Sequence, residues 1–297
     1  MRYSAFVKQS VSRILRKKVN REAITWLTCY DYSSASALNL TKLDMILVGD
    51  SGGMTVLGYE DTVPVTMEEM LFLCKAVRKG APDKFIVGDM PKGSYEISDA
   101  LAVENAMRFV KESGCDAIKL EGSGVMVDRL HAISSAGIPV IGHIGLTPQT
   151  SSQFGGYRVV GRTSSEAEKL REDALKIQAA GAFMILLEAT PVEIGASITG
   201  SLDIVCMGIG AGGKTDGQLL ILHDLLGWYP TFRPKFAKCY VPEVLPEFLQ
   251  SISEVSDLIQ YGRESRLDGF ARLIFLAVNA FIDDVENGRF PGSNYTY

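Results

Sequence analysis

Short apolar segments recur along the chain, and each of them stops at a polar residue or a glycine. Such near-continuous apolar runs are typical of parallel strands that are buried on both faces. The runs cover residues 23–27, 45–48, 85–87, 116–120, 138–141, 182–187, 204–209 and 219–222. The pattern therefore predicts eight parallel strands.

Segments with apolar residues at three- and four-residue spacing lie between these runs. They cover residues 67–78, 97–113, 125–136, 164–180 and 192–197. Thr66 with Glu69 has the form of a capping box, and Thr147 before Pro148 has the form of an N-cap followed by proline. Alternating strands and helices form either an open doubly wound sheet or a barrel, and we expect an α/β fold built as a (β/α)8 TIM barrel.

Both ends of the chain extend beyond the repeat. Residues 1–21 carry seven Lys or Arg and no acid, which fits an organellar presequence or, as we expect, a basic helix over residues 1–22 that closes the bottom of the barrel. The tail, residues 241–297, has helical patterns near 244–261 and 267–286 and an extended docking segment at 288–291. A barrel takes about 250 residues, so we expect a single domain over residues 1–297.

Composition narrows the class of protein. A hydrophobic content of 46%, a charged content of 22% and a net charge of −5 are ordinary for a soluble globular protein and favour neither nucleic acid nor a membrane as partner. No apolar run reaches the roughly 18 residues of a membrane span. The five cysteines are scattered without a Cys-x-x-Cys pair, so we expect a reducing compartment such as the cytoplasm and a small-molecule partner.

Carboxylates stand at the ends of the second, third and fourth predicted strands, which are neighbours in a barrel. They are Asp50, Asp89 and Glu121. Three adjacent carboxylates do not all ionise cheaply without a cation, so a hard ion such as Mg²⁺ is their natural ligand. The alternative for one or two of them is a structural role as an N-cap or ion-pair partner.

Three more side chains near strand ends carry candidate chemistry. Lys119 projects to the same side of its strand as Glu121, where it stabilises a substrate carboxylate or enolate or only pairs with an acid. His143 is either structural or a hydrogen-bonding partner of the substrate. Glu188 closes an otherwise apolar strand, so we expect dry surroundings, a tunable proton affinity and a role as acid or base.

Two other motifs are less decisive. Residues 208–213 read Gly-Ile-Gly-Ala-Gly-Gly, the pattern of dinucleotide sites, but they follow the seventh strand instead of the first, so we expect no nicotinamide there. His223 and Asp224 follow the eighth run and fit either a structural role or contact with a cosubstrate. His131 lies in a helical segment and is expected at the surface.

Taken together, these motifs resemble the ketopantoate hydroxymethyltransferase family. The resemblance extends from residue 24 to residue 240. The motifs that carry it include Leu-Thr-Cys-Tyr-Asp-Tyr at 27–32, Leu-Val-Gly-Asp-Ser at 47–51, Asp-Met-Pro at 89–91, Lys-Leu-Glu-Gly at 119–122, Gly-His-Ile-Gly-Leu-Thr-Pro-Gln at 142–149, Gly-Ile-Gly-Ala-Gly at 208–212 and Pro-Lys-Phe at 234–236.

The resemblance implies a barrel of the phosphoenolpyruvate mutase and isocitrate lyase group. It implies transfer of a hydroxymethyl group from 5,10-methylenetetrahydrofolate to 3-methyl-2-oxobutanoate through a Mg²⁺-stabilised enolate, giving 2-dehydropantoate for pantothenate biosynthesis. It also implies a homo-oligomer, a decamer. The implied site has Glu188 as proton acceptor, Asp50, Asp89 and Glu121 as Mg²⁺ ligands, and Asp50, Ser51, Asp89, Lys119 and His143 around the oxo acid.

The chain departs from the family pattern at three positions. Gly53 and Lys92 stand where a large apolar residue and a phenylalanine are expected, which predicts a more open and more cationic pocket mouth, and Cys74 replaces a common histidine. The tail after Tyr240 is also longer than is usual in the family.

Other functions remain open at this point. The chain could be a Mg²⁺-dependent lyase or mutase of the same group, or a hydroxymethyltransferase for a different 2-oxo acid. The catalytic Lys-Lys-Cys-Gly-like loop of the lyases is absent from the sequence. The intact set of acidic residues disfavours a non-catalytic scaffold.

Overall fold

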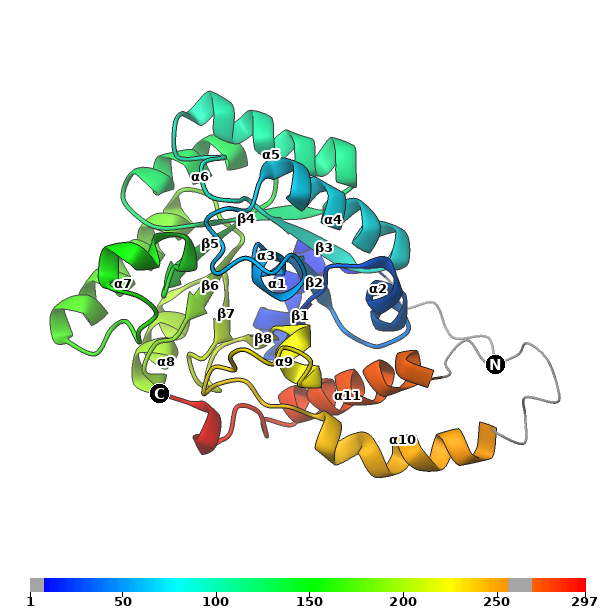
Figure 1. Cartoon of the computed structure of the whole chain (residues 1–297). Helices are drawn as coiled ribbons and strands as arrows, with labels where there is room; N and C mark the ends of the chain where they lie inside the picture. The colour runs from blue at the N-terminus through cyan, green and yellow to red at the C-terminus, as the bar shows by residue number, and fades with distance from the viewer. Residues whose placement is uncertain (1–7, 256–268) are drawn as a thin grey trace.

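The computed structural model describes residues 8–255 and 269–297 and contains a closed barrel of eight parallel strands in chain order (Figure 1). The predicted (β/α)8 barrel is therefore confirmed. Residue Ile24 pairs with Gly217 where the last strand meets the first and closes the barrel. The strands are β1 Ile24–Thr28, β2 Met45–Val48, β3 Phe85–Asp89, β4 Ala117–Glu121, β5 Val140–Gly145, β6 Met184–Glu188, β7 Val205–Ile209 and β8 Gly217–Leu220.

Helices surround the barrel and cover its outer face (Figure 1). Thr66 and Glu69 form the predicted capping box at the start of α4. Thr147 precedes a 3-10 helix, η1 Pro148–Phe154, but its hydroxyl contacts Thr150 Oγ1 at 2.7 Å and does not cap a backbone N–H. The helices that follow the strands are α2 Tyr32–Asn39, α3 Gly52–Thr55, α4 Met67–Gly80, α5 Asp99–Ser113, α6 Val125–Ser135, α7 Ser164–Ala179, α8 Val192–Ser201 and α9 Leu222–Leu226.

The eighth strand begins two residues earlier than the prediction of 219–222, and Leu222 already belongs to α9. The reason is Gln218, a polar residue that occupies a buried strand position. Its amide Nε2 donates to Gly212 O at 3.1 Å and to Thr215 Oγ1 at 2.8 Å, so its burial leaves no unpaired amide. A search for apolar runs misses such a residue.

A basic helix, α1 Val11–Asn20, lies at the end of the barrel where the strands begin. Lys17 pairs with Asp44 at 2.7 Å and Lys18 pairs with Asp216 at 2.8 Å, and each acid directly precedes a strand. Ile14 of this helix is fully buried. The helix therefore contacts the strand-start end of the barrel through two ion pairs, and residues 1–7 of the expected helical segment lie outside the described residues.

The tail forms two helices, α10 Val241–Val255 and α11 Gly269–Glu286, followed by a 3-10 turn, η2 Ser293–Tyr295. The two helices lie side by side along one edge of the barrel, with α11 also packed on α2 (Figure 1). The other predicted helical positions, 256–261 and 267–268, lie outside the described residues. Phe290 is buried against Tyr240, Phe281 and Tyr295, so the predicted docking segment does contact the core.

Within the described ranges, no helix is long and apolar enough to cross a membrane. All five cysteines carry free thiols.

Candidate active site

A cavity of about 500 Å³ opens at the end of the barrel where the strands finish. Ligand pockets commonly measure about 300–1,000 Å³, and catalytic groups of TIM barrels gather at this end. The cavity brings together all the predicted site residues: Asp50, Ser51, Asp89, Lys119, Glu121, His143 and Glu188.

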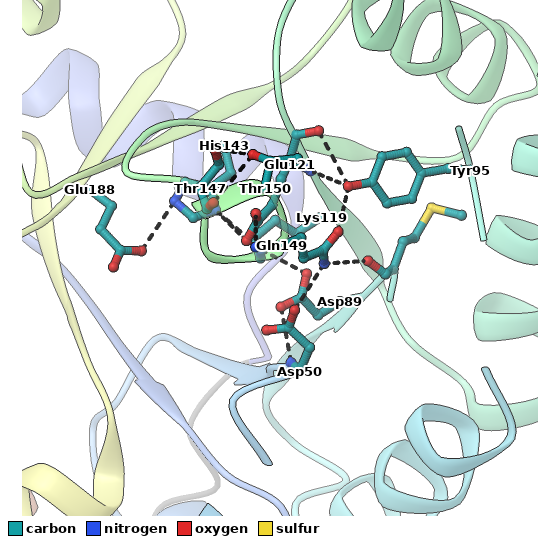
Figure 2. Close-up of polar contacts among 11 residues, drawn as sticks. Asp50, Asp89, Tyr95, Lys119, Glu121, His143, Thr147, Gln149, Thr150 and Glu188 are labelled. Atoms are coloured by element: carbon teal, nitrogen blue, oxygen red, sulfur yellow. Dashed lines mark hydrogen bonds and ion pairs between the residues drawn. The ribbon is translucent and has the colours of Figure 1, made fainter. Parts of the chain in front are cut away.

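Lys119 lies among three buried carboxylates at the inner end of this cavity (Figure 2). Its Nζ is 2.7 Å from Asp89 Oδ1 and 3.4 Å from Glu121 Oε1. The backbone N–H of Asp50 donates to Asp89 Oδ2 at 3.1 Å. Lys119 and Glu121 meet because they are two residues apart on β4 and therefore share a face.

Burial and repulsion between the carboxylates set their ionisation. The pKa of Asp50 is raised well above its usual value by burial and by the charges of Asp89 and Glu121. Burial also raises the pKa of Asp89, against the opposing effect of Lys119. Burial alone would raise the pKa of Glu121 as well, but Lys119 and His143 lower it to about 2.

Lys119 itself stays an ammonium. Burial would lower its pKa, but Asp89, Glu121 and Asp50 outweigh that effect and raise it. The site therefore holds more acidic groups than this one lysine neutralises.

His143 joins this acidic cluster to Glu188. Its Nδ1 lies 3.2 Å from Glu121 Oε1, and its Nε2 lies 3.2 Å from Glu188 Oε2 (Figure 2). Burial and Lys119 disfavour protonation of His143, but the two glutamates outweigh them and raise its pKa to about 9. Glu188 has a side chain that is 15% exposed, so its surroundings are wetter than the sequence suggested.

Gln149 and Tyr95 were not singled out individually from the sequence, although both support the cluster (Figure 2). Gln149 Nε2 donates to Asp50 Oδ2 at 2.9 Å, and its backbone N–H donates to Glu121 Oε2 at 3.1 Å. Tyr95 OH donates to Gln149 Oε1 at 2.6 Å. Neither residue follows an apolar run. Gln149 ends the 142–149 motif, but its contacts with Asp50 and Glu121 appear only in three dimensions.

Ser51 is the N-cap residue of α3 and lines the cavity beside Asp50. Its hydroxyl contacts Tyr30 OH at 2.8 Å. The Tyr30 ring is buried, which fixes the position of this hydroxyl at the cavity wall.

The donor set suits a hard divalent cation that has few protein ligands. Among residues 8–255 and 269–297, no group of three or more Asp, Glu, His or Cys side chains is arranged to hold a metal ion. Lys119 lies against both Asp89 and Glu121. Mg²⁺ is commonly held by only one or two carboxylates, with water and substrate completing its shell. Asp50 and Asp89 are adjacent and insufficiently neutralised, so they fit that role.

Two departures from the family pattern do not act on the cavity as predicted. Lys92 pairs with Glu96 at 3.0 Å and is not part of the cavity wall. A side chain at Gly53 would collide with Val65, whose Cγ2 is 2.4 Å from the expected Cβ position. Gly53 therefore leaves no opening, and the prediction of a more open mouth made cationic by Lys92 is wrong. Cys74 is buried on α4, away from the cavity wall.

The remaining sequence motifs have other roles. Gly210 has a φ of 68° after β7, and a side chain there would collide with Phe236, which explains the glycine without a dinucleotide. His131 is exposed, as predicted. His223 stacks on Trp228, with ring centroids 5.1 Å apart, whereas Asp224 lines the cavity.

Comparison with known proteins gives the same picture of the chain. Residues 8–262 match the family model described as ketopantoate hydroxymethyltransferase. A 3-methyl-2-oxobutanoate hydroxymethyltransferase of Alkaliphilus metalliredigens is 51% identical over 78% of this chain and 82% of its own length. The enzyme of the same name from Desulfotalea psychrophila is 42% identical over 98% of this chain and 95% of its own length.

Solved structures share the fold at low sequence identity. A phosphonopyruvate hydrolase in complex with oxalate and Mg²⁺ has a TM-score of 0.57 and 12% identity, covering 96% of this chain and 100% of that one. A 2,3-dimethylmalate lyase of the PEP mutase/isocitrate lyase superfamily has a TM-score of 0.55 and 12% identity, covering 95% and 98%. These likenesses show that the chain shares its barrel fold with both proteins.

Proposed function

Since this chain belongs to the ketopantoate hydroxymethyltransferase family, we propose that it transfers a hydroxymethyl group from 5,10-methylenetetrahydrofolate to 3-methyl-2-oxobutanoate. The product is 2-dehydropantoate, for pantothenate biosynthesis. The observation that carries this proposal is the cavity, which has Lys119 and three carboxylates at its inner end. His143 contacts both Glu121 of this cluster and Glu188.

Asp50, Asp89 and Glu121 are the proposed ligands of Mg²⁺. Oxygens of all three already contact Lys119 or Gln149, so these two residues would share the carboxylates with the cation. When bound, the cation supplies Lewis acidity that lowers the cost of an enolate by several kcal/mol.

Lys119 and Ser51 bind and orient the oxo acid in this proposal. The Lys119 ammonium neutralises the substrate carboxylate and the charge that develops on the enolate oxygen. Asp89 holds the lysine in place at 2.7 Å. The Ser51 hydroxyl, fixed by Tyr30, hydrogen bonds to the substrate from the neighbouring wall.

Glu188 removes the proton from C3 of the oxo acid. A positioned base contributes about 100- to 10,000-fold to such a step. His143, in contact with Glu188, orients its carboxylate. The resulting carbon nucleophile forms a bond to the methylene carried by the folate as one of its two C–N bonds breaks. Water then supplies the hydroxyl group as the second C–N bond breaks, and both nitrogens remain in the departing tetrahydrofolate.

A Mg²⁺-dependent lyase or mutase is the alternative, and it needs no folate. The deciding assay follows 3-methyl-2-oxobutanoate and its products with and without 5,10-methylenetetrahydrofolate and Mg²⁺. The proposal expects consumption only when both are present, with 2-dehydropantoate as product. Cleavage of a 2-oxo acid or hydroxy acid without folate would favour the lyase instead.

The proposed assembly is a homo-oligomer, a decamer as in the family resemblance. Sedimentation velocity of the purified chain tests this. A monomeric species at micromolar concentration would contradict it.

A further inference from the structure

Asp224 is a buried carboxylate that the proposed chemistry does not use. It lies in α9 immediately after β8, its side chain is 4% exposed, and it lines the same cavity as Glu188. Within the described residues, no hydrogen bond or ion pair reaches its carboxylate, although Arg233 is close enough to act on it electrostatically. The side chain is mostly buried but lines the cavity without a partner in the described part of the protein, so its carboxylate is available to a ligand.

The position of Asp224 separates it from the oxo acid. In a closed barrel of strands 1 to 8 in order, β8 lies opposite β4, which carries Lys119 and Glu121. An anionic oxo acid bound at Lys119 therefore leaves the β8 side of the cavity to a second molecule. A cavity of about 500 Å³ is several times larger than that small acid.

The residues that line the cavity around Asp224 indicate the chemistry of the second molecule. Leu219, Ile221, Tyr229 and Phe232 line the cavity on the same stretch of chain. Apolar and aromatic side chains with one carboxylate suit a flat heterocycle that presents hydrogen-bond donors on one edge. The pterin ring of a folate has such an edge, formed by its 2-amino group and the adjacent ring N–H, and a carboxylate accepts both donors at once.

We propose that Asp224 binds the pterin edge of the folate cosubstrate and thereby presents its methylene group to the oxo acid beside Glu188. This inference rests on the proposed function. Neither Asp224 nor its neighbours hold the metal or the oxo acid, so the two assignments can fail separately.

The test is calorimetric titration of tetrahydrofolate into the wild type, Asp224→Asn and Asp224→Ala, with Mg²⁺ and 3-methyl-2-oxobutanoate present. Loss of a charge-assisted pair predicts affinity weaker by about 10- to 100-fold in both variants. Asp61→Asn is the matched control, since Asp61 is an exposed acid that acts electrostatically on Tyr157 of the cavity wall. It should change the affinity less than about threefold, because exposed charges contribute little.

A ligand lacking the 2-amino group locates the contact. Removing that group from tetrahydrofolate should weaken binding to the wild type about 10-fold but leave binding to Asp224→Ala nearly unchanged, because the two groups form one interaction. Equal losses in both proteins would overturn the inference, as would unchanged tetrahydrofolate affinity in Asp224→Asn.

Two controls separate folding and function from this contact. Asp224→Asn should unfold at the same or a higher temperature than the wild type, because it removes a buried unpaired charge, and a lower temperature would indicate a structural role and overturn the inference. If the wild type exchanges the C3 proton of the oxo acid but does not bind tetrahydrofolate, the folate-dependent function fails and the pterin site fails with it.

Discussion

The acidic side chains at the two ends of the barrel have opposite environments. At the bottom, Asp44, Asp116 and Asp216 each contact a lysine or arginine and also accept a backbone N–H from a neighbouring strand. At the mouth, Asp50, Asp89 and Glu121 share Lys119, and Asp224 has no ion-pair partner in the described residues. The bottom acids join strands, whereas the mouth acids face a cavity.

The difference separates stability from binding. A paired, hydrogen-bonded carboxylate favours the folded state, whereas carboxylates crowded together disfavour it until a cation or donor arrives. The fold therefore places its electrostatic stabilisation where the strands begin and leaves uncompensated charge where they end. This asymmetry agrees with the general division of TIM barrels into a stabilising and a catalytic face.

The largest expected effect comes from Glu188→Gln at the mouth. It should lower the rate of solvent deuterium exchange at C3 of 3-methyl-2-oxobutanoate at least 100-fold, the low end for loss of a general base. Its thermal unfolding should match that of the wild type. Exchange at the wild-type rate would remove Glu188 from the role of base.

Asp89→Asn should reduce Mg²⁺-dependent binding of the oxo acid by on the order of 100-fold, because it removes a charge from the cation site and from Lys119. Calorimetry with and without Mg²⁺ measures this. Equal affinities for wild type and variant in the presence of Mg²⁺ would contradict the metal assignment.

The bottom of the barrel should respond in stability instead. Asp44→Ala removes the partner of Lys17 and the acceptor of the Thr25 N–H, which should lower the free energy of unfolding by about 3 kcal/mol. Denaturant unfolding provides the value. Activity per folded molecule should stay within about twofold, and a large loss of turnover would break the comparison.

Lys92→Phe should have the smallest effect. Lys92 is paired with Glu96 and is not part of the cavity wall, so restoring the family residue should leave kcat/KM within about twofold. The measurement compares kcat/KM for 3-methyl-2-oxobutanoate and 2-oxoglutarate in both proteins. A changed ratio would show that the loop after β3 reaches the substrate.

The sequence predicts the strands well because parallel strands are buried on both faces and stand out as apolar runs. It fails at β8, where Gln218 is buried with its amide satisfied. The ends of the strands likewise predict the residues of the site, including Asp50 and Glu188.

The residues that hold these site residues in place by hydrogen bonds cannot be predicted from the ends of apolar runs. Gln149 and Tyr95 hold Asp50 and Glu121 through hydrogen bonds between distant segments, and no local spacing encodes such contacts. Lys92 illustrates the converse error, because a residue that departs from a family pattern need not face the pocket.

The most direct test of the account is thermal unfolding with and without Mg²⁺ and 3-methyl-2-oxobutanoate for wild type, Asp89→Asn and Asp44→Ala. Ligand at 100 times its Kd should stabilise the wild type by about 2.7 kcal/mol. Asp44→Ala should show the same gain from a lower starting stability, whereas Asp89→Asn should show almost none. If ligand stabilises Asp89→Asn as much as the wild type, or does not stabilise the wild type at all, the claim that the acids at the mouth serve ligand binding is contradicted.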